Sequence, residues 1–227
     1  MKLSNKILIG FFALVFIYLT AVFAEIRLRG TSVAMDDSNS IAETVDISGV
    51  AYLVLHDLDN TINVVGSDQP RVEVRSSSGD LLRTLKYTIS GDTLKLSQGP
   101  PDDSKRVKIS VFVPKSSLKG MTVDAATAVV EGLQLKHLDV SQHRGRVWIY
   151  GSSLGNIRLE LSGLSYLQIY DTGMDTLSAT IEQSEVYIAS PVRLLKGSLK
   201  NAAFLRVMGV DEIQFKKDES SRLHLYE

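Results

Sequence analysis

Two short patterns in the sequence carry residue types that act in catalysis. Gly151-Ser152-Ser153-Leu154-Gly155 has the letters of the hydrolase nucleophile elbow, and Ser116-Ser117-Leu118-Lys119 has those of the β-lactamase serine–lysine pair. An elbow needs a strand before the serine and a helix after it, but residues 156–161 alternate like a further strand. The serine–lysine pattern lacks its partner motifs, S-D-N and K-T-G. We therefore expect a solenoid corner and a turn, and we assign no catalytic residue.

Possible metal ligands are equally sparse. Asp57, Asp59 and Thr61 begin like a calcium loop, but the sixth position is Ile62 where such loops have glycine, and the twelfth is Asp68 where they have glutamate. A turn is the expected reading. The histidines lack the i, i+4 spacing of a helical zinc site, although two of them, His137 and His143, could approach each other around a corner. We expect solvent-exposed histidines, no metal site and no cofactor; the four histidines are His56, His137, His143 and His224.

The composition narrows the classes of function. The 227 residues carry a formal net charge of −1, so the chain has no basic footprint for nucleic acid. Cysteine is absent, which excludes disulfides, thiolate zinc sites, cysteine nucleophiles and a lipid-modified N-terminal cysteine. Stability must come from packing and from hydrogen bonds within sheets.

The N-terminus predicts export. Residues 7–24 carry no charge and follow Lys2 and Lys6, as in a signal peptide or a short transmembrane helix. Val22 and Ala24 fit a cleavage site, but the length favours a retained anchor, and both alternatives stay open. We expect residues 1–24 to export the rest of the chain, either as a retained membrane anchor or as a signal peptide that is cleaved. Residues 25–49 read as a linker.

The rest of the chain, residues 50–227, predicts an all-β domain. Short alternating runs separated by turn signals indicate a hairpin-rich part over residues 50–117, and Ser90-Gly91-Asp92 is the strongest hairpin signal. From residue 118 a triplet with apolar first and third positions recurs at steps of 20, 19, 19 and 18 residues. Its copies are Val147-Trp148-Ile149, Leu167-Gln168-Ile169, Val186-Tyr187-Ile188, Leu205-Arg206-Val207 and Leu223-His224-Leu225.

Such a repeat predicts a right-handed parallel β-solenoid (a single-stranded β-helix) with regular coils over residues 118–227. An antiparallel sandwich or barrel is the alternative. A second triplet series precedes the first by about ten residues. Its expected outward residues are polar and form no acidic cluster, so they give no positive case for an enzyme: Thr122, Asp139, Arg158, Ser178, Ser198 and Gln214.

The outward side of the first triplet series is the best candidate for a binding face. Stacked in register, it exposes aromatic side chains beside arginine and glutamine, which suit protein interfaces or stacking on sugars. The alternatives are a structural ladder or self-association. The residues of this face are Trp148, Tyr150, Gln168, Tyr170, Tyr187, Arg206, His224 and Tyr226, and the same two columns include Ala189 and Met208.

The series resembles the "head GIN domain" family of adhesin-like proteins of Gram-negative envelopes. The resemblance covers roughly residues 50–227 and rests on the triplets and on Ile62-Asn63-Val64-Val65-Gly66, Arg71-Val72-Glu73-Val74, Asp92-Thr93-Leu94-Lys95-Leu96 and Val107-Lys108-Ile109-Ser110-Val111-Phe112-Val113-Pro114. It implies a β-helical fold, an adhesin-like role and a place in the bacterial cell envelope, either anchored in the inner membrane and facing the periplasm or exported after cleavage. It carries no active-site residues.

Together these features predict a non-catalytic envelope protein that serves as an adhesin-like, assembly or binding module. Its expected partners are the membrane, through the N-terminal helix, and a second copy, an envelope protein or a glycan at the aromatic side. The alternatives are a glycan-active enzyme on a β-helix and an accessory subunit of a membrane complex.

Overall fold

The computed structural model describes Phe16 and residues 41–76, 85–98 and 107–226. The chain divides into two units, Met1–Ser40 and Ile41–Glu227. The predicted anchor or signal peptide lies outside the described residues except for Phe16, which is helical. Among the described residues, no helix has the length and apolar character needed to cross a membrane.

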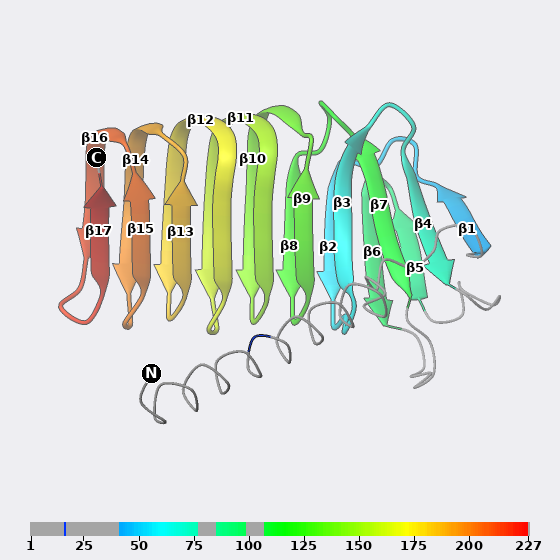
Figure 1. Ribbon diagram of the computed structural model, residues 1–227, viewed down its shortest axis with the longest axis horizontal. Helices are drawn as coiled ribbons and strands as arrows, with labels where there is room; N and C mark the ends of the chain where they lie inside the picture. Colours follow the sequence, from blue (N-terminus) through cyan, green and yellow to red (C-terminus); the bar gives the residue numbers. More distant parts are fainter. Residues whose placement is uncertain (1–15, 17–40, 77–84, 99–106, 227) are drawn as a thin grey trace, which may run out of the picture. The chain divides into compact units, whose positions relative to one another are not determined.

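The second unit is built from strands (Figure 1). Their order and bounds are β1 (Ile41–Asp46), β2 (Tyr52–His56), β3 (Thr61–Ser67), β4 (Arg71–Ser76), β5 (Leu85–Ser90), β6 (Thr93–Gln98), β7 (Lys108–Pro114), β8 (Gly120–Asp124), β9 (Thr127–Glu131), β10 (Gln134–His143), β11 (Arg146–Ser162), β12 (Tyr166–Glu182), β13 (Glu185–Ala189), β14 (Val192–Lys200), β15 (Phe204–Met208), β16 (Val210–Lys217) and β17 (Arg222–Tyr226).

From β8 onward the strands form a β-solenoid of about six turns. Each coil places one strand on each of two sides, and strands of successive coils pair in parallel. The long strands β11 and β12 bend through a corner, so each contributes to two coils. The predicted parallel solenoid is confirmed, and its right-handed winding stays a prediction.

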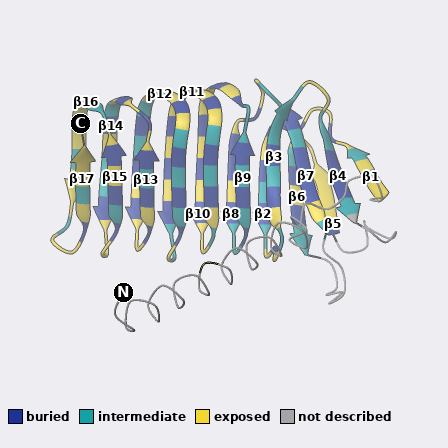
Figure 2. Ribbon diagram, in the orientation of Figure 1, coloured by how far each residue is buried: buried dark blue, intermediate teal, exposed yellow. Residues whose placement is uncertain are grey.

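The core of the solenoid consists of the inward residues of the triplets. Val147, Leu167, Val186 and Leu205 are register partners on successive strands, and all are fully buried. Along most strands of the solenoid, buried and accessible positions alternate, as Figure 2 shows. Each coil therefore covers the apolar residues of its neighbour, which explains why the repeat needs several copies to be stable.

Buried hydroxyl groups join the coils at two corners. Ser152 Oγ accepts a hydrogen bond from the Leu133 N–H group of the preceding coil (3.2 Å) and donates to the Tyr150 carbonyl (3.0 Å). Ser184 Oγ likewise accepts from the Ser165 N–H group (3.2 Å) and donates to the Glu182 carbonyl (2.7 Å). These hydroxyls satisfy backbone groups that would otherwise be buried without a partner. The Gly151–Gly155 segment is thus a corner, as expected.

The part predicted to be hairpins, residues 50–117, contains two further coils. β2 pairs in parallel with β6 and β8, and β3 pairs in parallel with β7 and β9. The β2–β3 coil therefore lies between the β6–β7 coil and the β8–β9 coil, out of chain order. The expected hairpin at Ser90-Gly91-Asp92 is confirmed, since β5 and β6 pair antiparallel across it.

Antiparallel strands cover the outer edge of the β6–β7 coil. β5 pairs with β6, β4 pairs with β7, and β1 pairs with β4. β1 lies within residues 25–49, where the sequence predicted a linker. We call this the capped end, and it forms the right-hand side of Figure 1.

Candidate binding surface

The outward residues of β11, β12, β13, β15 and β17 form the aromatic face predicted from the sequence. The register aligns one column as Trp148, Gln168, Tyr187, Arg206 and His224. The second column aligns Tyr150 with Tyr170 and Ala189, and further along it aligns Met208 with Tyr226. The steps of the repeat therefore predicted which side chains are neighbours. Whether they bind a ligand remains a prediction.

Two aromatic residues that the sequence reading missed connect this face. Tyr166 and Phe204 begin β12 and β15, one outward position before the triplet. With them the rings form a continuous series, in which Trp148–Tyr166, Tyr166–Tyr187, Tyr187–Phe204 and Phe204–His224 have centroid distances of 6.1, 5.5, 5.4 and 5.2 Å. Strict alternation extended one residue before each triplet, which is two residues before its outward member, would have identified both.

Neighbouring groups fix the edges of this face. The Tyr150 ring stacks on Tyr170 with a centroid distance of 5.2 Å. A hydrogen bond to the Glu131 carboxylate, with burial, raises the pKa of Tyr150 to about 12. The Arg206 guanidinium lies 5.6 Å from the Tyr187 ring centroid and 5.0 Å from that of Tyr226, within cation–π range. The rings are thus ordered by contacts within the face.

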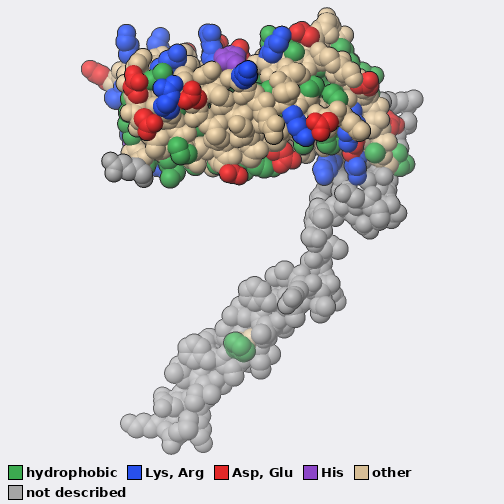
Figure 3. All heavy atoms as spheres, turned by 90° about the horizontal axis from the view of Figure 1, so that it is seen from above, with side chains coloured by type: hydrophobic (Ala, Val, Ile, Leu, Met, Phe, Trp, Pro, Cys, Tyr) green, Lys and Arg blue, Asp and Glu red, His purple; other side chains and the backbone are tan. Residues whose placement is uncertain are grey.

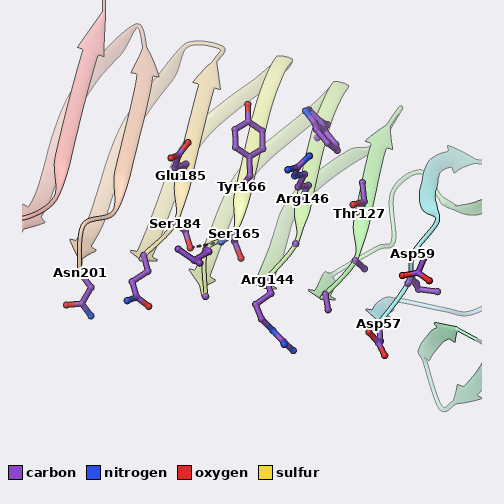
Figure 4. Close-up of a pocket in the computed structure, with 18 of the residues that line it drawn as sticks. Asp57, Asp59, Thr127, Arg144, Arg146, Ser165, Tyr166, Ser184, Glu185 and Asn201 are labelled. Carbon is purple, nitrogen blue, oxygen red and sulfur yellow. Dashed lines mark hydrogen bonds between the residues drawn. The ribbon is translucent and has the colours of Figure 1, made fainter.

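A groove of about 1160 Å³ runs along the corner where each coil enters the aromatic face (Figure 4). Its walls are the corner turns of successive coils and the first residues of the strands that follow. The lining includes Arg146, Trp148, Tyr166 and Glu185, so the groove and the aromatic series share two rings. One rim carries Leu164, whose side chain is 83% exposed. An extended ligand on the aromatic face would also contact this groove.

The charged groups of the groove are of both signs. Arg144 donates to Asp124 (3.2 Å), whose other oxygen lies 3.0 Å from His56 Nδ1. Burial would raise the pKa of Asp124, but the hydrogen bonds and charges of Arg144 and His56 outweigh it and lower that pKa. Arg146 and Glu185 are exposed, and among the described residues Arg146 has no ion-pair partner. Arg146 is therefore available to a ligand.

The catalytic and metal patterns of the sequence lie in turns and strands. Ser153 is exposed within β11, and Asp59 accepts a hydrogen bond from Gln98 (2.6 Å) in the turn between β2 and β3. His137 and His143 do not meet around a corner, because both belong to β10, where they contact Asp139 and Ser162 respectively. Both are exposed, as expected. The described residues contain no group of three or more potential metal ligands.

The opposite side of the solenoid is polar. Asp139, Arg158, Ser178 and Gln214 share one register column as expected, but the β14 member is Lys196. Thr122 and Ser198 lie in the next column, shifted by two residues, which keeps them outward. The repeat was hard to read here because Gly197 occupies an inward position of the triplet. Charges of both signs are scattered over the solenoid in the view of Figure 3, rather than gathered in one patch.

Comparison with known proteins identifies the fold. No family model and no curated protein match the sequence. A solved structure from Bacteroides fragilis, described as a "putative adhesin", is 13% identical, with a TM-score of 0.58 over 82% of this chain and 96% of its own. A second "putative adhesin", from Parabacteroides distasonis, is 11% identical, with a TM-score of 0.51 over 84% and 94%. The chain shares the fold of these proteins, and the "head GIN domain" name stays a prediction.

Proposed function

We propose that this protein is a non-catalytic, adhesin-like binding module that holds an extended glycan on its aromatic face, outside the cytoplasm. The observation that carries the proposal is the continuous ring series from Trp148 to His224, which crosses five neighbouring strands beside an open groove. Apart from the exposed His224, these rings are half-buried, so their faces are ordered yet accessible.

The chemistry of this strip suits a sugar chain. Ring faces pack against the apolar faces of sugars, and flanking polar groups bind hydroxyls. Gln168 lies between the rings of Trp148 and Tyr187 in the register column, and Arg146 and Glu185 lie in the adjoining groove. Because strands of successive coils are about 4.8 Å apart, the strip offers contacts at a regular interval along the solenoid axis.

The geometry gives no support to the alternative of a glycan-cleaving enzyme. Such enzymes place two carboxyl groups about 5–9.5 Å apart across the scissile bond. In the groove, Glu185 is four coils from Asp57 and Asp59, roughly 19 Å at about 4.8 Å per coil, so it cannot act with either of them across one bond. Asp57 and Asp59 both belong to the single turn between β2 and β3. Asp59 is also engaged by Gln98. The groove is therefore proposed as a binding surface only.

Two further points support the location and the role. The uncharged stretch of residues 7–24 is suited to export. The two structures of the same fold are described as "putative adhesins", a role that requires exposure on the cell surface. The finer assignment, an inner-membrane anchor facing the periplasm, is part of the same proposal.

Binding of the purified full-length chain to a glycan array tests the proposal. Replacing Trp148 and Tyr187 together by serine should weaken binding about tenfold or more, since two ring contacts of roughly 0.5–1.5 kcal/mol each are lost. Tyr87→Ser is the matched control, because Tyr87 is an exposed tyrosine on β5 at the capped end. Glycan binding that stays at the wild-type level after the double substitution would contradict the proposal. A wild-type chain that binds a protein but no glycan would also contradict it.

A further inference from the structure

The last coil of the solenoid, formed by β16 and β17, has an open outer edge. β16 pairs with β14 and β17 pairs with β15, and no strand among the described residues pairs with their other edges. Each edge therefore presents N–H and C=O groups that are able to pair with another strand.

Apolar side chains accompany these free edges. Ile213 and Leu225 occupy inward triplet positions, as their register partners Leu195 and Val207 do. Leu195 and Val207 are 0% exposed, but Ile213 and Leu225 are 42% and 44% exposed, because no further coil within the described part of the chain stacks on them. The open end thus exposes residues that belong to the core of the solenoid. Such an exposed apolar surface is typical of one partner of a permanent protein–protein interface.

The charges of β16 point to the occupant. Asp211 and Glu212 stand near the start of the strand, and Lys216 and Lys217 stand at its end. Two copies of β16 that run antiparallel therefore oppose unlike charges. Residues that face the core must lie opposite residues that face the core. The two-fold axis of the β16–β16 strand pair must therefore pass through a residue position and not between two positions.

Among the registers centred on Ile213, Gln214 and Phe215, only the one at Gln214 matches charge and polarity throughout. Along the regular part of the strand, this register opposes Glu212 to Lys216 and Ile213 to Phe215. A centre at Ile213 would oppose Glu212 to Gln214, and a centre at Phe215 would oppose Ile213 to Lys217.

We propose that the open end binds a second copy of this chain, end to end, through antiparallel pairing of β16 centred on Gln214. The two-fold axis is normal to both sides of the solenoid, which also pairs β17 with its own copy. This symmetry closes the contact after two subunits. It keeps the aromatic faces of both copies on one side of the dimer. The inference is independent of the proposed ligand.

A charge exchange tests the pairing. Light scattering and sedimentation of the full-length chain in mild detergent should report a dimer. Glu212→Lys alone and Lys216→Glu alone each create two like-charge contacts, which should raise the dissociation constant about tenfold. The double variant E212K/K216E restores both pairs and should return the constant to within about threefold of the starting value. Glu160→Lys, an exposed change of the same charge on β11, is the control.

A cysteine pair tests the register, since the chain contains no cysteine of its own. Directly opposed residues in antiparallel strands have Cα atoms about 4.5–5.5 Å apart, within the range of a disulfide. Gln214→Cys should therefore give a covalent dimer on mild oxidation, and Thr180→Cys, exposed on β12, should not. A chain that stays monomeric at all concentrations, a double variant no better than the singles, or equal cross-linking of both cysteines would overturn the proposal.

Discussion

At the capped end of the solenoid, β4 and β5 pair antiparallel with the outermost coil, whereas at the other end the edges of β16 and β17 face outward. The inward residues differ accordingly. Leu94 of β6 is fully buried, but Leu225 of β17 is 44% exposed. The triplet Leu223-His224-Leu225 has the same pattern as Val186-Tyr187-Ile188 in the middle of the solenoid. The triplet thus determines which side a residue occupies, and the neighbouring coil determines whether it is buried.

The largest expected difference between the ends concerns a matched pair of leucines. Leu94→Ala leaves a cavity in a filled core and should lower the free energy of unfolding by about 2–5 kcal/mol. Leu225→Ala removes a half-exposed side chain and should cost less than about 1.5 kcal/mol in the monomer. Urea unfolding of both variants measures the difference. Equal losses would mean that the open end is covered in solution. If a dissociable dimer covers it, dilution should reduce the loss caused by Leu225→Ala and leave that of Leu94→Ala unchanged.

A carboxylate at the capped end should have the next largest effect. Glu73 on β4 is almost fully buried between Arg71 (3.2 Å) and Arg75 (2.5 Å). Burial alone would raise the pKa of Glu73, but the hydrogen bonds and charges of the two arginines outweigh it and lower that pKa. Glu73→Gln should therefore cost about 1.5–3 kcal/mol at neutral pH.

The same lowered pKa gives the sign of a pH dependence. The stabilisation by Glu73 is complete above its unfolded pKa, about 4.3, and is lost as the pH falls through the lower folded value. Chemical unfolding at a series of pH values should show the gap between the wild type and Glu73→Gln closing below about pH 4. A gap that is constant from neutral to strongly acidic pH would refute this account.

The smallest effect is expected at the open end, where Asp218 holds the last corner. Its carboxylate accepts from the N–H groups of Asn201 (2.7 Å) and Ser221 (2.9 Å). A hydrogen bond from the Ser221 side chain, followed by that of the Asn201 N–H group, lowers the pKa of Asp218 to about 2. Asp218→Ala should speed amide hydrogen exchange in β16 and β17 while leaving the capped end unchanged. In the wild type, this protection should persist above about pH 4 and fade toward pH 2. Faster exchange throughout the chain would show that the last coil is not an independent unit.

The aromatic side was predictable because its repeat is nearly constant. Steps of 18–20 residues place Trp148, Gln168, Tyr187, Arg206 and His224 in one column, and the register agrees. The polar side was less predictable, since Gly197 takes an apolar position and hides the β14 triplet. An added Cβ at Gly197 would lie 1.8 Å from the Ala179 carbonyl oxygen, so only glycine fits there.

The groove and the capped end could not be read from the sequence. The groove depends on how corner turns of different coils line up, and corner residues follow no repeat. The pairing of β2 with β6 joins residues 41 positions apart, and the pairing of β2 with β8 joins residues 68 apart. Neither separation is a whole number of the 18–20-residue steps of the later repeat. The local alternation therefore indicated where strands lie but not which strands pair.

The position of the β2–β3 coil between β6–β7 and β8–β9 has a consequence for the order of folding. During synthesis, β2 and β3 emerge first, but both partners of each strand are made later. This coil can bury its two edges only after residue 131 has left the ribosome, whereas each coil after β9 can add directly to the one before it. Closing such long loops costs entropy before any contact offsets it, so assembly of this region should be the slow step. The later coils would then extend rapidly from a template that the chain completes out of order.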